Sequence, residues 1–277
     1  MSPTIHRIFR CAALVALVAL AVSSSARAQK SKAIRPLSAK VVAKIAADLA
    51  AADPATAIAA AKQLGKAAGA TGLEALLDAL SVGLHPKVAV AALDAVSEHS
   101  SPKAFEFAAT YARHRNPNVR AAAVRALVAG GGPKMETAVL AALHDGNAGV
   151  RLAAADAVAA MKIRAGIEPL LALLARGDDA AVKALGRMAD ADLARRVAEA
   201  VGTAPDTAVA RCLGTMLVRA DFGPEEARVE VVRALGRVPG DESLEQLTNY
   251  VATIPEKPPR ASRTEAEATI ETRLGGS

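Results

Sequence analysis

Residues 88–96 read VAVAALDAV, and similar stretches recur along the chain. Apolar residues in this stretch fall at i, i+4, i+7 and i+8 from Val88, which is the spacing of one face of a helix. Val90 and Leu93 make the flanks apolar as well, so the helix must be buried on several sides. The stretch therefore predicts an inner helix packed between its neighbours and a partner helix.

Three further copies follow the same pattern: TAIAAAKQL from Thr56, VRAAAVRAL from Val119 and VRLAAADAV from Val150. Together with the stretch from Val88, the four copies start at steps of 32, 31 and 31 residues. Self-similarity at a period of 20–50 residues is the signature of a solenoid. A second helix is predicted in each period, as in residues 136–144. The sequence thus predicts an all-α protein, an α-solenoid of about seven helical hairpins over residues 39–252.

The repeats loosen towards the C-terminus. The stretches 182–188, 210–216 and 232–238 are alike, but they recur at steps of 28 and 22. A glycine follows the shared leucine in each of them, and glycine costs about 1 kcal/mol against alanine inside a helix. We expect a close approach between helices to compensate for that cost.

The composition excludes several classes of protein. Alanine accounts for 69 of 277 residues, and aromatic residues make up only 2%. Such a chain cannot build a thick core of rings or a broad β-sandwich, whereas alanine favours helices that pack closely. It also lacks the stacking rings that platforms for single-stranded nucleic acid require.

The first 28 residues have the pattern of a signal peptide for export. Arg7 and Arg10 form a basic start, residues 11–22 are an unbroken apolar run, and residues 26–28 are a small-x-small cleavage site. The run is too short to span a bilayer as a helix, which needs about 20 residues. We expect an exported protein, periplasmic or secreted, with no transmembrane span in the mature chain. The alternative is an N-terminal anchor that stays uncleaved.

Most of the positive charge lies at the N-terminal end. The net charge is +6, of which residues 1–28 carry +3 and residues 29–44 another +5, so residues 45–277 sum to −2. We expect residues 29–38 to be a basic lead-in, and residues 29–44 to offer a contact with an anionic envelope surface. A nucleic-acid interface needs cations spread over a folded face. The near-neutral body therefore argues against a nucleic-acid partner.

Residues 253–277 differ from the repeats. Three prolines between residues 255 and 259 predict a Pro-rich linker, and residues 264–274 predict a polar helix with few apolar anchors. We expect a flexible C-terminal tail. The alternative is a helix that caps the final repeat.

The pattern D-x-x-x-x-V-R-x-x-A-x-x-A-V at residues 145–158 resembles the second-helix signature of HEAT repeats, particularly the short HEAT-like repeats of the phycobilisome-lyase type. The pattern at residues 119–127 matches again, but His114 stands in the place of the acid. The resemblance covers about residues 39–240 and implies a binding scaffold. It also implies that Asp145 and Arg151 fix the turn between two helices, while the equivalent Arg120 lacks the acid in its own motif.

Residues of alternating charge occupy one column of the successive inner helices: Lys62, Asp94, Arg125, Asp156 and, at the shortened register, Lys183. Stacked repeats would bring neighbouring charges of this column within reach of one another. One interpretation is a ladder of exposed ion pairs that sets the register, each pair contributing about 0–1 kcal/mol. The other is a charged ridge on the inner, concave face that binds a partner.

No enzymatic motif is present: the sequence lacks GxSxG, a phosphate loop, GxGxxG and HExxH. The histidines outside the signal have neither cysteine partners nor HxxxH spacing, so we predict no metal and no cofactor. Cys212 lies in an apolar helical setting, which predicts a buried structural thiol.

Together these features predict a non-enzymatic scaffold outside the cytoplasm that binds a protein partner along the inner face. The alternatives are a bilin-lyase-like enzyme, suggested only by the repeat subtype, and a nucleic-acid-binding protein of HEAT type. A further possibility is attachment to the envelope through residues 29–44.

Overall fold

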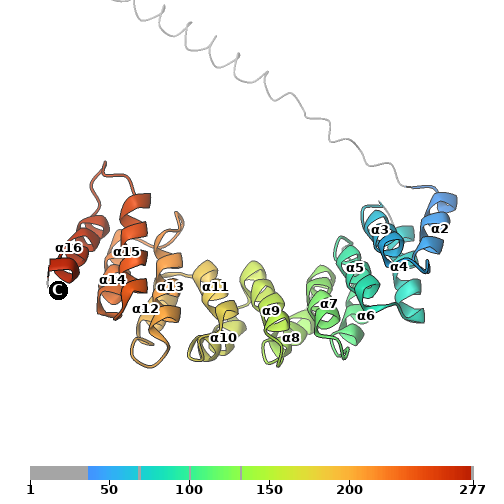
Figure 1. The fold of residues 1–277 in the computed structure, drawn as a ribbon, viewed down its shortest axis with the longest axis horizontal. Helices are drawn as coiled ribbons and strands as arrows, with labels where there is room; N and C mark the ends of the chain where they lie inside the picture. Colours follow the sequence, from blue (N-terminus) through green and yellow to red (C-terminus); the bar gives the residue numbers. More distant parts are fainter. Residues whose placement is uncertain (1–36, 68–69, 100, 132, 276–277) are drawn as a thin grey trace, which may run out of the picture. The chain divides into compact units, whose positions relative to one another are not determined.

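A computed structural model describes residues 37–67, 70–99, 101–131 and 133–275 (Figure 1). The predicted signal peptide, residues 1–28, and nearly all of the basic lead-in lie outside these residues. Of the basic stretch 29–44, Lys40 and Lys44 are described, and both are exposed on the first helix. None of the helices in the described ranges has the length and apolar character needed to cross a membrane.

All regular secondary structure in these ranges is helical, which confirms the predicted all-α class. The helices are α2 (Ala39–Asp48), α3 (Pro54–Gly65), α4 (Ala70–Val82), α5 (Pro86–Val96), α6 (Pro102–Tyr111), α7 (Pro117–Gly130), α8 (Pro133–Ala142), α9 (Ala148–Met161), the 3-10 turn η1 (Arg164–Gly166), α10 (Ile167–Leu174), α11 (Asp179–Met188), α12 (Ala191–Ala198), α13 (Asp206–Leu217), α14 (Glu225–Arg237), α15 (Asp241–Thr253) and α16 (Ala261–Gly275).

The helices form two layers, and in one of them each helix packs on the next-but-one in the chain. We call α3, α5, α7, α9, α11, α13 and α15 the odd layer, since each packs on the next in that order. We call α2, α4, α6, α8, α10, α12, α14 and α16 the even layer. From α2–α3 to α14–α15 the chain makes seven hairpins in the described residues, in agreement with the predicted number.

The odd-layer helices start at capping residues that keep a constant period. From α3 to α11 the side chain before the helix accepts a hydrogen bond from a backbone N–H of the first turn, and such caps stabilise a helix by about 1 kcal/mol. These capping residues are Asp53, His85, Asn116, Asn147 and Asp178, at steps of 32, 31, 31 and 31. The period of 31 therefore runs unbroken from α5 to α11.

Small residues allow close packing within the odd layer. Ala92, Ala123 and Ala154 occupy equivalent positions and are fully buried. Farther along, a Cβ atom added to Gly186 of α11 would lie 2.6 Å from Cγ2 of Thr215 on α13, which is closer than real Cβ contacts come. The expected close approach at this glycine is confirmed.

The expected equivalence of residues 232–238 with the two preceding stretches is wrong. Those residues belong to α14, which packs on α12 and α16 and so lies in the even layer, whereas 182–188 and 210–216 lie in the odd layer. The step of 22 residues therefore links helices of different layers. The sequence could not separate them, because an amphipathic helix of either layer presents the same kind of apolar face. Gly236 of α14 instead approaches Thr269 of α16.

The C-terminal tail is not the flexible segment that its polarity predicts. Residues 261–275 form α16, which packs on α14 and α15 and adds a final helix to the even layer. Polar groups make the attachment: Tyr250 Oη lies 2.5 Å from Ser262 Oγ, and Ser262 donates to Glu225 Oε1 through its backbone N–H at 2.8 Å. The scarcity of apolar anchors misled the prediction, because the buried hydrogen bonds of Ser262 add to the packing of the buried Ala266 in the core.

Candidate functional site

Two arginines close the turns that lead into α7 and α9; we call Arg120 and Arg151 the turn arginines. Nη1 of Arg120 donates to the carbonyl oxygens of His114 at 2.9 Å and Arg115 at 3.2 Å. Nη1 of Arg151 donates to the carbonyl oxygens 31 residues later, those of Asp145 at 3.0 Å and Gly146 at 3.2 Å. Each guanidinium thus satisfies backbone acceptors in the turn that follows the preceding even-layer helix.

Each turn arginine also reaches an acid of the next hairpin. Nε of Arg120 donates to Asp145 Oδ2 at 2.8 Å, and Nε of Arg151 donates to Asp178 Oδ2 at 2.6 Å. These pairs are largely shielded, since the Arg151 and Asp178 side chains are only 21% and 10% exposed. The hydrogen bonds that Arg120 donates hold the pKa of Asp145 below its usual range, and the same hydrogen bonds raise the pKa of Arg120.

The turn role implied by the resemblance for Asp145 and Arg151 matches these contacts, although the two do not pair through their side chains. Arg120 lacks an acid in its own motif, yet it takes Asp145 from the following hairpin. The residue 31 positions after Asp145 is Arg176, so Arg151 takes its acid from the capping residue Asp178 instead. Sequence reasoning missed these bridges because it searched for the acid within one repeat.

The charged column expected on the odd layer is present in two exposed pairs. Nη2 of Arg125 on α7 lies 2.7 Å from Asp94 Oδ1 on α5, with side chains 46% and 44% exposed. Asp156 on α9 pairs with Arg187 on α11. Lys62 on α3 is exposed and forms no ion pair with any described residue.

The place assigned to Lys183 in this column is wrong. Since the capping residues keep a step of 31 as far as Asp178, the position equivalent to Asp156 is Arg187, and it is Arg187 that makes the contact. Lys183 lies one helical turn earlier on α11, exposed and without an ion pair in the described part of the chain.

Charge is segregated between the two layers, which the overall near-neutrality of the body conceals. From α3 to α11 the odd-layer helices carry seven cations and three acids, a net charge of +4. The even-layer helices between them, α4 to α10, carry two cations and five acids, a net charge of −3. All three odd-layer acids are paired with arginine, so the cations without a partner among the described residues are Lys62, Lys87 and Lys183.

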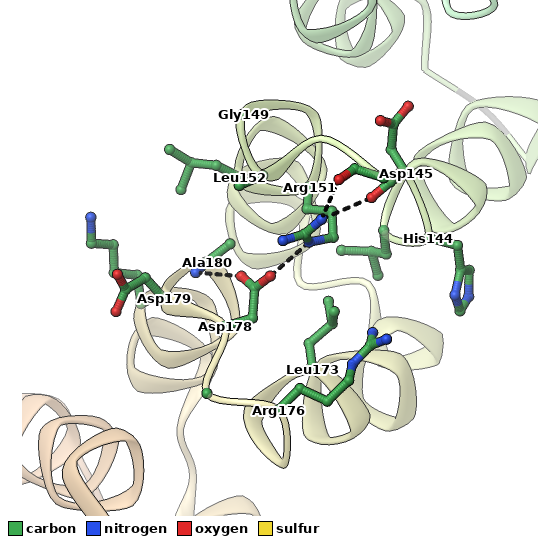
Figure 2. Close-up of a pocket in the computed structure, with 15 residues that line it drawn as sticks. His144, Asp145, Gly149, Arg151, Leu152, Leu173, Arg176, Asp178, Asp179 and Ala180 are labelled. Carbon is green, nitrogen blue, oxygen red and sulfur yellow. Dashed lines mark hydrogen bonds and ion pairs between the residues drawn. The ribbon is translucent and has the colours of Figure 1, made fainter. Parts of the chain in front are cut away.

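A cavity of about 750 Å³ opens between the turn that leads into α9 and the turn that leads into α11 (Figure 2). Its walls include the Arg151–Asp178 pair, Leu152 and Leu173, together with the ends of α8 and α10. Figure 2 shows Arg151 hydrogen-bonded to Asp178 and, through the backbone, to the turn at Asp145. The other charged residues of the lining are Asp179, Arg176 and Lys183.

Reactive groups are scarce in the described ranges. Burial raises the pKa of the Cys212 thiol to about 12, and the side chain is inaccessible on α13, which confirms the predicted buried cysteine. No three His, Cys, Asp or Glu side chains of the described residues converge as metal ligands. The arrangement offers charged and apolar contacts for binding.

These features define an α-solenoid in which Arg120 and Arg151 each close the turn of one hairpin and form an ion pair with the next. The family model of HEAT repeats matches residues 73–141 and 108–189. Residues 73–189 are therefore HEAT repeats, as the motif at residues 145–158 predicted, and HEAT repeats generally mediate binding to other proteins.

Solved structures with similar folds include the complex of CpcE and CpcF of phycocyanin lyase from Nostoc sp. PCC7120, at 15% identity and a TM-score of 0.45, covering 87% of this chain and 97% of that one. An engineered protein is similar at 19% identity and a TM-score of 0.34, covering 85% of this chain and 99% of that one. No curated protein matches the sequence.

Proposed function

We propose that this chain is a non-catalytic scaffold outside the cytoplasm that binds an acidic protein partner along the exposed face of the odd layer. The segregation of charge carries the proposal: the odd layer from α3 to α11 has a net charge of +4, and every acid on it is already paired with arginine. Complementary charge steers a partner towards such a face and disfavours wrong partners.

The paired charges support binding in a second way. Asp94–Arg125 and Asp156–Arg187 link successive odd-layer helices at the surface, and exposed pairs of this kind contribute only about 0–1 kcal/mol to stability. They fix the spacing of the helices while leaving the lysines free. A partner therefore meets a surface on which the available charges are positive.

The small number of unpaired cations on the odd layer favours a protein over a nucleic acid as the partner. A duplex is held by contacts to about 6–10 phosphates, whereas the odd-layer helices from α3 to α11 offer only Lys62, Lys87 and Lys183 without an acid partner in the described residues. Isolated carboxylates of a folded protein match such scattered cations better.

Export is part of the proposal and rests on the sequence of residues 1–28. The test is to fractionate cells that express the full chain and to determine the N-terminus of the protein. We expect it in the exported fraction, beginning at Gln29. Recovery from the cytoplasm with residues 1–28 intact would refute the proposed location.

Binding is tested by placing a photoreactive residue at Leu152 of α9, which is exposed on the odd layer, and at Ala141 of α8, which is exposed on the even layer. Irradiation of intact cells should join one defined protein to the Leu152 variant and leave the matched Ala141 variant uncoupled. No adduct at Leu152, or equal adducts at both sites, would contradict the proposal.

A further inference from the structure

The cavity between the turns leading into α9 and α11 has an excess of free positive charge. Its three acids are all occupied: Asp145 binds Arg120, Asp178 binds Arg151, and Asp179 lies 3.0 Å from Arg211. The two remaining cations of the lining, Arg176 and Lys183, have no ion pair with any described residue and are exposed. Lining residues and their partners together leave a charge of +2.

The cations are carried by different elements of the cavity wall. Arg176 follows α10, and Lys183 lies on α11. Figure 2 shows Asp179 on one side of Asp178 and Arg176 on the other, with Leu173 between Asp178 and Arg176. The lining also includes Leu143, which is buried, and Leu152, whose exposed side chain presents aliphatic surface beside the charged groups.

We infer that this cavity is a docking site for an acidic segment of the partner protein, with Arg176 and Lys183 binding its carboxylates and the exposed Leu152 contacting its aliphatic groups. The inference rests on the proposed function and names the part of the surface that selects the partner. A volume of about 750 Å³ admits several side chains of an extended segment.

The hydrogen bonds of Asp178 explain why Arg176 and Lys183 remain available to a partner. Asp178 already accepts from Nε of Arg151 and from the backbone N–H of Ala180 at 2.9 Å, so its carboxylate is directed into the turn and not towards Lys183. Carboxylates of a partner bind Arg176 and Lys183 without displacing an existing ion pair. Such charge-assisted hydrogen bonds are about twice as strong as neutral ones.

The test measures the anisotropy of fluorescein-labelled hexaglutamate as the full-length protein is added at low salt, with hexaglutamine as the uncharged comparison. Wild-type protein should bind hexaglutamate more tightly, and the difference should shrink as salt is added. The Arg176→Glu/Lys183→Glu variant should bind about tenfold more weakly, since two rim charges are reversed.

Lys134→Glu/Lys162→Glu is the matched control. Both lysines are exposed and form no ion pair in the described ranges, and they lie at the other ends of the hairpins, where α8 begins and α9 ends. This variant should bind hexaglutamate within about twofold of wild type. Equal thermal midpoints for both variants show that neither has lost its fold.

Three outcomes overturn the inference: equal binding of hexaglutamate and hexaglutamine by wild type, equal losses in the two double variants, or tighter binding of a 20-base-pair DNA duplex than of hexaglutamate. If the Leu152 adduct persists in the Arg176→Glu/Lys183→Glu protein, the docking site is wrong while the proposed scaffold function stands. If the Leu152 photoreactive variant forms no adduct even when Arg176 and Lys183 are unchanged, the scaffold function itself fails.

Discussion

Replacing Arg151 by methionine removes one guanidinium that serves two hairpins at once. The aliphatic stem is retained, but the hydrogen bonds to Asp178, to the carbonyl oxygen of Asp145 and to that of Gly146 are lost. The Asp178 side chain is only 10% exposed, so water cannot fully replace its partner. Hydrogen bonds to charged groups contribute about 1.5–3 kcal/mol, and we expect the free energy of unfolding to fall by about 2–3 kcal/mol.

The matched control is Arg125→Met. Its pair with Asp94 spans successive odd-layer helices in the same way, but both side chains are nearly half exposed. We expect a loss of at most about 1 kcal/mol, because solvent and salt screen such a pair. The comparison separates the effect of burial from the effect of removing an arginine.

Urea unfolding followed by circular dichroism at 222 nm measures both losses. Because repeat proteins can unfold in parts, amide hydrogen exchange should also be recorded, and exchange in the Arg151→Met protein should rise first around α9 and α11. A double-mutant cycle with Asp178→Asn should give a coupling energy of about 1–3 kcal/mol. A loss for Arg151→Met no greater than that for Arg125→Met would refute the reasoning.

Three further outcomes are expected. Since the folded-state pKa of Asp145 is lowered chiefly by Arg120, its contribution is complete above the unfolded pKa of about 3.9 and is lost as pH falls through the folded value; the stability gap between wild type and Arg120→Met should therefore narrow below about pH 4 to the part that the hydrogen bonds to the His114 and Arg115 carbonyl oxygens contribute, and a constant gap would contradict this. Gly186→Ala should destabilise the protein by about 1–2 kcal/mol despite the better helix propensity of alanine, because the new Cβ meets Thr215; Thr215→Ser in the same chain removes Cγ2 but leaves the residue 215 Cβ 2.9 Å away, so it should restore only part of the loss in a urea titration. Cys212 should resist iodoacetamide in the native protein and react in denaturant, as peptide mass spectrometry would show, and rapid native labelling would exclude a buried thiol with a pKa of about 12.

The sequence predicted the architecture well, because the repeated pattern of apolar residues around Val88, Val119 and Val150 reports burial directly. The buried alanines and valines of α5, α7 and α9 follow that pattern. The number of hairpins followed from the period. The pattern failed beyond α13, since α14 presents an apolar face like that of an odd-layer helix but packs in the other layer.

The charged residues were harder to predict, because their partners lie one hairpin away. Arg120 finds its acid 25 residues later and Arg151 finds one 27 residues later, so no constant spacing links the two pairs. The capping residues kept a step of 31 and would have placed Arg187, not Lys183, in the column with Asp156. The attachment of α16 was missed for a different reason: it depends on buried hydrogen bonds, which leave no periodic signal.

Lysine footprinting tests the central claim, that the exposed face of the odd layer is the interaction surface. The wild-type protein, alone and with the partner captured at Leu152, would be acetylated with N-hydroxysuccinimidyl acetate and each lysine followed by mass spectrometry. Bound partner should slow the acetylation of Lys62, Lys87 and Lys183, and leave Lys134 and Lys162 reacting as in the free protein. Protection of Lys134 and Lys162 alone, or equal protection of all five lysines, would contradict the account.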